Sequence, residues 1–514
     1  MFFTVLSSSV EALPSNYPKA FLIRDNWNDW FEFSTLFHLI VFDEENNKHK
    51  LGDVKIGQFG LSKAERSPQI PDAFNSLDEN FFSLGQSDSY YAGLMNLSHA
   101  IREQVLNGLK DVVADLSLFN QAIDERVTKI SLLRDVTPMT VRGQFHRLLN
   151  GGSRLSAYNF SYLLHNRSGS SIPAIDLEFE VEPESNPPTN VHILIGRNGV
   201  GKTRILNYMT RALVDEDAIP NQFGFFTSQD NKNKLEIFAN IVSVTFSAFD
   251  DFEPLHENKD KTAGIKYSYI GLKRGINKGY KANPNPKSPY ILASEFVRSL
   301  KACIQGSRIN RWLKALEMLE ADPIFSEIEL ASLSDIKVID EFDKKARKIF
   351  GKLSSGHKIV LLTITRLVES VEERTLVLLD EPESHLHPPL LSAFTRALSE
   401  LLVHRNGVAI IATHSPVLLQ EVPRRCVWKL RRNGSEAIAE RPEIETFGEN
   451  VGTLTREVFG LEVTQSGFHK LLQDAVNQNK SFKQTMLMFD NELGSEARAI
   501  LRALIVERDS EQEM

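Results

Sequence analysis

The hydrophobic pattern divides the chain into an N-terminal module and a longer region of alternating strands and helices. Residues 31–42 are rich in aromatic and β-branched side chains and predict a strand, with a second strand at residues 54–56. Residues 89–113 predict one helix, because apolar side chains recur along them at helical spacing. The sequence Gly-Gly-Ser at residues 151–153 ends this α+β module of residues 1–150, whose role no motif indicates. The apolar positions of the predicted helix are Leu94, Leu97, Ile101, Val105 and Leu109.

Residues 151–445 have the pattern of an α/β domain, a mixed sheet with flanking helices. A short apolar strand at residues 191–195 runs directly into a glycine-rich loop, and a further strand is expected at residues 241–247. Residues 255–290 are predicted to be loop, and a helical insertion is expected at about residues 291–350.

Composition adds limits to this outline. The 514 residues are 42% hydrophobic and 25% charged, which suggests two or three globular domains, and residues 446–514 are expected to form a C-terminal helical segment. The two cysteines, Cys303 and Cys426, lie too far apart to suggest a disulfide framework or zinc ribbon, so a reducing, cytoplasmic location fits. No apolar run reaches the roughly 18 residues of a membrane helix. The net charge of −8 does not favour nucleic-acid binding by the whole molecule.

The glycine-rich segment at residues 196–203 reads Gly-Arg-Asn-Gly-Val-Gly-Lys-Thr and matches the P-loop pattern. Its glycines let backbone N–H groups cradle phosphates, Lys202 is expected to reach the β- and γ-phosphates, and the Thr203 hydroxyl is a Mg²⁺ ligand. The alternative is a chance match in a turn, which the preceding apolar strand disfavours. The predicted nucleotide-binding residues are Asn198, Gly199, Val200, Gly201, Lys202 and Thr203.

Two carboxylates follow a second apolar strand, in the sequence Thr-Leu-Val-Leu-Leu-Asp-Glu-Pro at residues 375–382. Ligands bind at the carboxyl ends of strands in open α/β sheets. Asp380 is therefore predicted to hold Mg²⁺, directly or through water, and Glu381 to polarise the attacking water. Alone, an acid at a strand end is usually a solvated turn, but the P-loop favours the functional interpretation.

Two weaker motifs complete the set. Residues 353–357 read Leu-Ser-Ser-Gly-His and precede a predicted helix, whose N-terminus can bind an anion. Alone, a simple N-cap would be the favoured interpretation, but the place of the motif just upstream of the Asp-Glu strand favours the functional one. Residues 408–416 form a buried strand that ends at His414, placed to contact the γ-phosphate, although a lone histidine is more often structural. The predicted anion-binding residues of the first motif are Ser354, Ser355 and Gly356.

In this order the four motifs resemble the Walker A, signature, Walker B and switch-histidine motifs of the ABC ATPase superfamily, over about residues 155–445. In that superfamily two ATP molecules lie between two nucleotide domains, and the P-loop of one subunit faces the signature of the other. The resemblance implies an ABC-type P-loop ATPase head that binds ATP and Mg²⁺. Because the chain has one copy of each motif, it also implies a homodimer with composite sites, in which Glu381 and His414 are catalytic.

The sequence departs from the transporter pattern at two places. The transporter signature is Leu-Ser-Gly-Gly-Gln, whereas this chain has Leu-Ser-Ser-Gly-His. The glutamine expected after the strand that follows the P-loop is replaced by Ser247, so the positioning of Mg²⁺ and water falls to Ser247 or Asp250. The second departure leaves the rate of hydrolysis open.

The segment Asp-Glu-Pro-Glu-Ser-His-Leu-His-Pro at residues 380–388 resembles the non-transporter branch with RecF-like, SMC-like and OLD-like ATPases. Its histidines, His385 and His387, can suggest a metal site, but a dimer-contact loop is the favoured interpretation. No heptads separate the P-loop from the signature, which argues against SMC types. No dense acidic constellation follows His414, which argues against a TOPRIM nuclease.

Within that branch, the chain is most similar to the PtuA ATPase of Septu antiphage defence systems, including the retron-linked form. The resemblance implies an ATPase subunit that regulates a separate HNH nuclease of the PtuB type through ATP-dependent dimerisation. The alternative is a RecF- or SMC-like ATPase that acts directly on DNA in repair or recombination.

A basic segment at residues 259–287 has eight lysines and arginines against one acid, with three interleaved tyrosines. This composition suits sequence-neutral contact with nucleic acid, such as retron RNA–DNA, and suits a solvated loop equally well. The basic residues are Lys259, Lys261, Lys266, Lys273, Arg274, Lys278, Lys281 and Lys287, and the tyrosines are Tyr267, Tyr269 and Tyr280.

Overall fold

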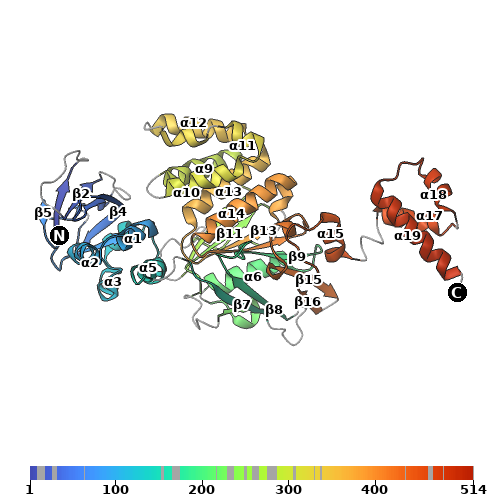
Figure 1. The fold of residues 1–514 in the computed structure, drawn as a ribbon, viewed down its shortest axis with the longest axis horizontal. Coiled ribbons are helices and arrows are strands. Elements are labelled where there is room, and N and C mark those ends of the chain that lie inside the picture. Colours follow the sequence, from blue (N-terminus) through green and yellow to red (C-terminus); the bar gives the residue numbers. More distant parts are fainter. Residues whose placement is uncertain are drawn as a thin grey trace.

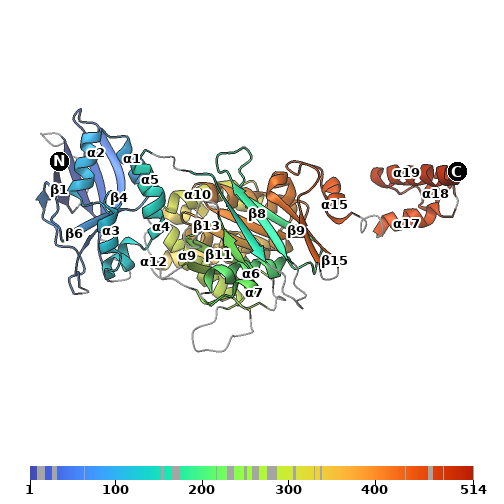
Figure 2. The same cartoon turned by 90° about the horizontal axis from the view of Figure 1, so that it is seen from below.

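A computed structural model shows an N-terminal domain and a C-terminal helical unit at opposite ends of a central α/β domain (Figure 1). The view from below shows the same order along the long axis (Figure 2). The structure describes the chain except for residues 8–17, 26–31, 63, 152–154, 165–173, 216, 229–236, 248–251, 258–264, 275–285, 305–307, 329, 336–338, 434–435, 461–466, 479 and 513–514.

The N-terminal domain is built on a six-stranded sheet with the order β5-β1-β2-β3-β4-β6. Only the β1–β2 pair is parallel among these strands. One hydrophobic core extends from Phe3 to Leu148 and joins the sheet to the short helices that follow it. The strands are β1 (Phe2–Leu6), β2 (Lys19–Arg24), β3 (Leu36–Phe42), β4 (Lys48–Gln58), β5 (Ala73–Phe74) and β6 (Phe81–Gly85). The helices are α1 (Asp88–Met95), α2 (His99–Gly108), α3 (Leu116–Ala122), α4 (Pro138–Thr140) and α5 (His146–Leu149).

The single helix predicted at residues 89–113 is wrong, because the chain forms α1 and α2 there instead. Asn96 caps the end of α1, and the Ser98 side chain accepts a hydrogen bond from the Ile101 N–H at the start of α2. Serine competes for backbone hydrogen bonds in this way and so favours a helix start over a helix interior. The five predicted apolar positions are nevertheless all buried.

The central domain contains a seven-stranded sheet with the order β12-β11-β13-β14-β9-β15-β16, in which only β16 is antiparallel. The predicted mixed α/β fold is confirmed. Residues 255–290 are not all loop as predicted, because β12 pairs with β11 within them. The strands are β9 (Val191–Gly196), β11 (Asn240–Thr245), β12 (Lys266–Gly271), β13 (Thr375–Asp380), β14 (Val408–Thr413), β15 (Val427–Asn433) and β16 (Glu436–Glu440).

The two faces of this sheet are covered by different layers. One face packs against α6 (Lys202–Val214) and a three-stranded antiparallel sheet, with Leu376 and Leu378 pointing into that core. Val377 and Leu379 point to the opposite face, which is covered by helices. The small sheet contains β7 (Tyr158–Leu164), β8 (Ile175–Val181) and β10 (Phe225–Thr227). The helical layer contains α9 (Pro289–Cys303), α10 (Arg308–Leu319), α11 (Pro323–Glu327), α12 (Ile339–Lys352), α13 (Ser355–Ser370) and α14 (Pro388–Val403).

The chain continues through α15 (Val451–Phe459) to a C-terminal unit with a small core of its own, which includes Leu472 and Leu501. This unit contains α17 (Gly467–Val476), α18 (Phe482–Met488) and α19 (Ser495–Gln512). Within the described residues, no helix combines the length and the hydropathy that crossing a membrane requires.

The pH dependence of the N-terminal domain follows from Asp111, a buried carboxyl group. Burial raises its pKa to about 7, against the N–H groups of Val113 and Ala114 and the Tyr91 hydroxyl, which lower it. Because the folded pKa lies above the unfolded value of about 3.9, the domain loses stability as pH rises between about 4 and 7. We expect Asp111→Asn to remove a slope of up to about 1.4 kcal/mol per pH unit.

Calorimetric unfolding of the full chain between pH 5 and 8 measures this slope. Asp115→Asn is the matched control, because hydrogen bonds from Ser117 and Leu118 lower the pKa of Asp115 and so place its titration below the measured range. An unchanged slope in Asp111→Asn would contradict the assignment.

Candidate functional site

The carboxyl edge of the large sheet gathers the predicted phosphate and magnesium residues. The strand register aligns Asp380 of β13 with Thr245 of β11 on one side and with Ala412 of β14 on the other. Thr413 of β14 is in turn aligned with Ile195, immediately before the P-loop. Ile195 and Thr413, which are 218 positions apart in sequence, therefore lie side by side at one edge of the sheet.

The P-loop connects β9 to α6. Gly199 and Gly201 have φ angles of 83° and 104°, a left-handed conformation that favours glycine. Lys202 begins α6, and its ammonium donates hydrogen bonds to the carbonyls of Gly196 at 3.0 Å and Arg197 at 3.1 Å. The lysine is thus held over the loop whose N–H groups are predicted to bind phosphate.

The magnesium ligands predicted from the sequence lie together. The Thr203 hydroxyl donates to Asp380 Oδ1 at 3.2 Å, which joins the first turn of α6 to the end of β13. Hydroxyl and carboxylate oxygens are the donors that Mg²⁺ prefers. This donor pair therefore fits the ion that the P-loop motif implies.

Glu381 has an unusual backbone conformation. Its φ and ψ angles are 44° and 56°, which costs about 1–3 kcal/mol for a residue with a side chain. Its N–H donates to the carbonyl of Ala412 at 2.9 Å, so the neighbouring strand holds this turn in place. Its side chain is one-third exposed, and Oε1 lies 3.6 Å from Nδ1 of His414. The predicted catalytic pair thus lies together at the sheet edge.

Glu383 is a member of the site that the sequence prediction missed. Its side chain is only 7% exposed, and Oε1 accepts hydrogen bonds from the Thr413 hydroxyl and from the His414 N–H at 2.8 Å. His414 Nδ1 lies 3.2 Å from the same oxygen. Glu383 therefore positions the turn that carries His414, and its place two residues after Glu381 was the available sequence signal.

Burial and the neighbouring carboxylates shift the pKa of Lys202 in opposite directions. Burial lowers the pKa of Lys202, whereas the carboxylates of Glu381, Asp380 and Glu383 act to raise it. Three acidic groups facing one buried ammonium leave this edge negative, a setting that suits a divalent cation together with a polyphosphate.

The predicted signature residues lie at the start of α13. Ser354 is the N-cap, and its hydroxyl accepts a hydrogen bond from the His357 N–H. Ser355 is exposed, whereas Gly356 is buried against the segment that follows Glu381. A Cβ atom on Gly356 would lie 2.4 Å from the carbonyl oxygen of His385, so this position requires glycine.

The remaining magnesium candidate, Ser247, lies two residues beyond Thr245, the β11 residue aligned with Asp380. Its N–H donates to Thr245 Oγ1 at 3.4 Å, and its side chain is half-buried. The alternative candidate, Asp250, lies outside the described residues.

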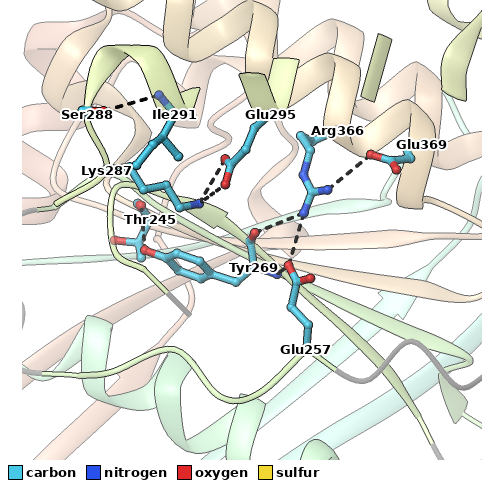
Figure 3. Close-up of polar contacts among 9 residues, drawn as sticks. All are labelled: Thr245, Glu257, Tyr269, Lys287, Ser288, Ile291, Glu295, Arg366 and Glu369. Carbon is cyan, nitrogen blue, oxygen red and sulfur yellow. Dashed lines mark hydrogen bonds and ion pairs between the residues drawn. The ribbon is translucent and has the colours of Figure 1, made fainter. Parts of the chain in front are cut away.

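The basic segment predicted as a nucleic-acid contact is described only in part. Tyr267 and Tyr269 are 2% and 5% exposed in β12, so the prediction that they could stack on bases is wrong. Lys287 lies over the Tyr269 ring and pairs with Glu295 at 2.9 Å (Figure 3). Lys266 pairs with Glu372 at 3.7 Å. The other members lie outside the described residues, except Lys273, which donates to the Phe252 carbonyl, and Arg274.

Figure 3 also shows that Tyr269 belongs to a hydrogen-bond network with the signature helix. Arg366 of α13 donates to Glu257 at 3.3 Å, to Glu369 at 3.3 Å and to the Tyr269 carbonyl at 3.4 Å. The Tyr269 hydroxyl donates to the Thr245 carbonyl at the end of β11. This network attaches the signature helix to the sheet edge that carries the magnesium candidates.

Comparisons with known proteins indicate the family of the chain. Residues 317–420 match the family described as "AAA domain, putative AbiEii toxin, Type IV TA system". The chain is 44% identical over 514 residues to protein ea59 of Escherichia phage lambda, and the alignment covers 96% of this chain and 95% of that protein.

Solved ABC structures are similar at a lower level. An inward-facing putative metal-chelate type ABC transporter is 13% identical, with a TM-score of 0.30 and coverage of 59% of this chain and 89% of that chain. The ADP conformation of an ATP-binding cassette of an ABC transporter is 15% identical, with a TM-score of 0.31 and coverage of 61% and 100%.

The family match includes the signature, the Asp380–Glu381 strand and His414, and the structure joins these to the P-loop at one sheet edge. The central domain is accordingly an ABC-like, ATP-binding P-loop domain, and the chain belongs to the family of the phage lambda protein ea59.

Proposed function

We propose that this chain hydrolyses ATP in composite sites between two copies of itself and uses the closed dimer to regulate a partner. The observation that carries the proposal is the placement of two motifs. The P-loop leads into α6 on one face of the large sheet, whereas the signature begins α13 on the other face. The sheet thus separates the two helices within one copy. Because Ser355 is exposed, it is available to the nucleotide that a second copy binds.

The chemistry of each site follows from its residues. Mg²⁺ would be held by Thr203 and Asp380 and would neutralise charge on the phosphates. Lys202 binds the phosphates, and Glu381 orients and polarises the water for in-line attack on the γ-phosphorus. His414, fixed by Glu383, contacts the γ-phosphate and so responds to its loss.

For the partner, we propose an HNH nuclease of the PtuB type in an antiphage defence complex. The partner is proposed from the sequence resemblance to PtuA, and the matched family is described as a putative toxin of a toxin–antitoxin system. Co-purification with an HNH protein encoded beside this gene tests the partner. A gene neighbourhood without such a nuclease would contradict this part of the proposal and leave the ATPase part standing.

Glu381→Gln is expected to keep ATP binding and to lower kcat at least about 10²-fold, because the amide cannot accept a proton from the attacking water. The unhydrolysed nucleotide should then hold the dimer closed. Steady-state phosphate release and the mass of the protein with ATP, measured by light scattering, check both effects. Glu317→Gln, on the exposed side of α10, is the matched control. Normal turnover in Glu381→Gln would remove Glu381 from the mechanism.

Mixing two inactive variants tests whether the sites are composite. Lys202→Ala removes phosphate binding from one copy, and Ser355→Arg places a bulky side chain at the exposed start of α13 in the other. Each variant alone is expected to be inactive. A mixed dimer regains one complete site, formed by the intact P-loop of one copy and the intact signature of the other.

Equal mixing should therefore restore about a quarter of the wild-type ATPase rate, if copies pair at random and each site works independently. Lys202→Ala mixed with Glu381→Gln is the control, because both changes damage the same half-site and no complete site can form. Activity that stays absent in the first mixture would show that each site is formed within one chain.

A further inference from the structure

Three side chains from separate segments converge beside the signature. Asp322 precedes α11, His357 lies in the first turn of α13, and His387 precedes α14. Each offers one ligand atom, and these atoms lie within 4.8 Å of one another. Asp322 and His357 are 8% and 5% exposed, whereas the His387 side chain is about half exposed.

The distances suit a bound metal ion. His357 Nε2 lies 3.1 Å from Asp322 Oδ1, and His387 Nε2 lies 3.4 Å from Asp322 Oδ2. A tetrahedral Zn²⁺ with bonds of about 2.0–2.2 Å separates its ligand atoms by about 3.3 Å. These two distances end on different oxygens of Asp322, and the three ligand atoms lie within 4.8 Å of one another, so a contraction of the cluster would bring all three onto one ion.

In one of its two tautomers, the surroundings of His357 favour a cation. Ser354 Oγ lies 2.5 Å from His357 Nδ1 and also accepts the His357 N–H. If Oγ accepts both, the proton of the neutral ring is on Nδ1, and the Nε2 lone pair points at a carboxylate. That arrangement is repulsive unless a proton or a metal ion lies between them. Metal-binding histidines commonly donate their other ring N–H to an oxygen in this way.

We propose that Asp322, His357 and His387 form a transition-metal site of the Zn²⁺ type, with a fourth position open to water on the exposed side of His387. Two imidazoles and one carboxylate are the donor set of many zinc sites with an open position. Ligation by His387 moves its proton to Nδ1, so the site forms at the expense of the 3.4 Å hydrogen bond that Leu390 N–H donates to that atom. The ion would link the helical insertion, the signature and the segment after Glu381.

The site does not depend on ATP hydrolysis, so it is tested without nucleotide or Mg²⁺. The full chain is stripped with a chelator, and Zn²⁺ is titrated in competition with a chromophoric chelator. One tight equivalent is expected for the wild type. His387→Asn should weaken that equivalent at least about tenfold, because one of three ligands is lost. Asparagine is also a good N-cap, so the start of α14 is preserved.

His385→Asn is the matched control, since it makes the same change two residues away at an exposed histidine outside the cluster. It should bind Zn²⁺ like the wild type. Asp322→Asn, which retains a capping oxygen for α11, should lose affinity as His387→Asn does. If the wild type takes up no stoichiometric Zn²⁺, or if His385→Asn and His387→Asn bind it equally, the cluster is only a carboxylate hydrogen-bonded to two imidazoles and the proposal fails.

Discussion

The register of the parallel strands is the constraint on which the rest of the nucleotide site depends. Parallel pairing aligns the ends of neighbouring strands. The end of β13 therefore lies beside the ends of β11 and β14, and the end of β14 lies beside the end of β9. A slip of one residue in β13 would turn Asp380 to the opposite face and carry Glu381 away from His414. The alternating burial of Leu376 and Leu378 on one face, and of Val377 and Leu379 on the other, prevents that slip.

Hydrogen bonds from the strand and loop ends stabilise the strained backbone and the buried charged side chains at the sheet edge. Glu381 keeps a left-handed backbone because its N–H is bonded to Ala412 of the neighbouring strand. Lys202 keeps its ammonium buried because two loop carbonyls accept from it. Glu383 is buried because the end of β14 supplies donors to one of its oxygens. Each feature that is unfavourable alone is therefore stabilised by a strand or loop end.

Local patterns predicted much of this arrangement, and the failures have a physical reason. The P-loop and the Asp-Glu strand are continuous in sequence, so their chemistry and their strands could be predicted from residues 191–203 and 375–382. The strand β12 was missed because its residues combine lysine and tyrosine with glycine nearby, and their burial depends on pairing with β11. The intrinsic β-propensity of a segment does not account for such pairing with a distant strand.

The contacts of Glu383 and Asp322 were beyond prediction for a related reason. Glu383 meets Thr413, 30 residues on, and Asp322 meets His357 and His387, which are 35 and 65 residues on. The place of Glu383 after Glu381 was the one signal in the sequence, and nothing in the spacing of Asp322 distinguishes it from an ordinary surface acid. Pairing of β13 with β14 brings Glu383 to Thr413, whereas folding of the helical insertion against α13 brings Asp322 to the two histidines.

That insertion is joined to the signature helix over much of its length, which limits how the signature can move. The Trp312 indole N–H donates to Thr365 Oγ1 at 3.1 Å, and Arg311 donates to the Val371 carbonyl at the end of α13. Trp312 is fully buried, and replacing it with alanine would cost about 3–5 kcal/mol. These contacts therefore join α10 firmly to α13.

The same helix reaches the N-terminal domain. Arg308, in the first turn of α10, pairs with Asp135 at 2.6 Å. Burial acts to lower the pKa of Arg308, but the nearby carboxylates, Asp135 first, raise it above its usual value. Because breaking a largely buried ion pair leaves an uncompensated charge, the contact resists separation. The Arg308–Asp135 pair thus connects α10, which packs against the signature helix, to the N-terminal domain.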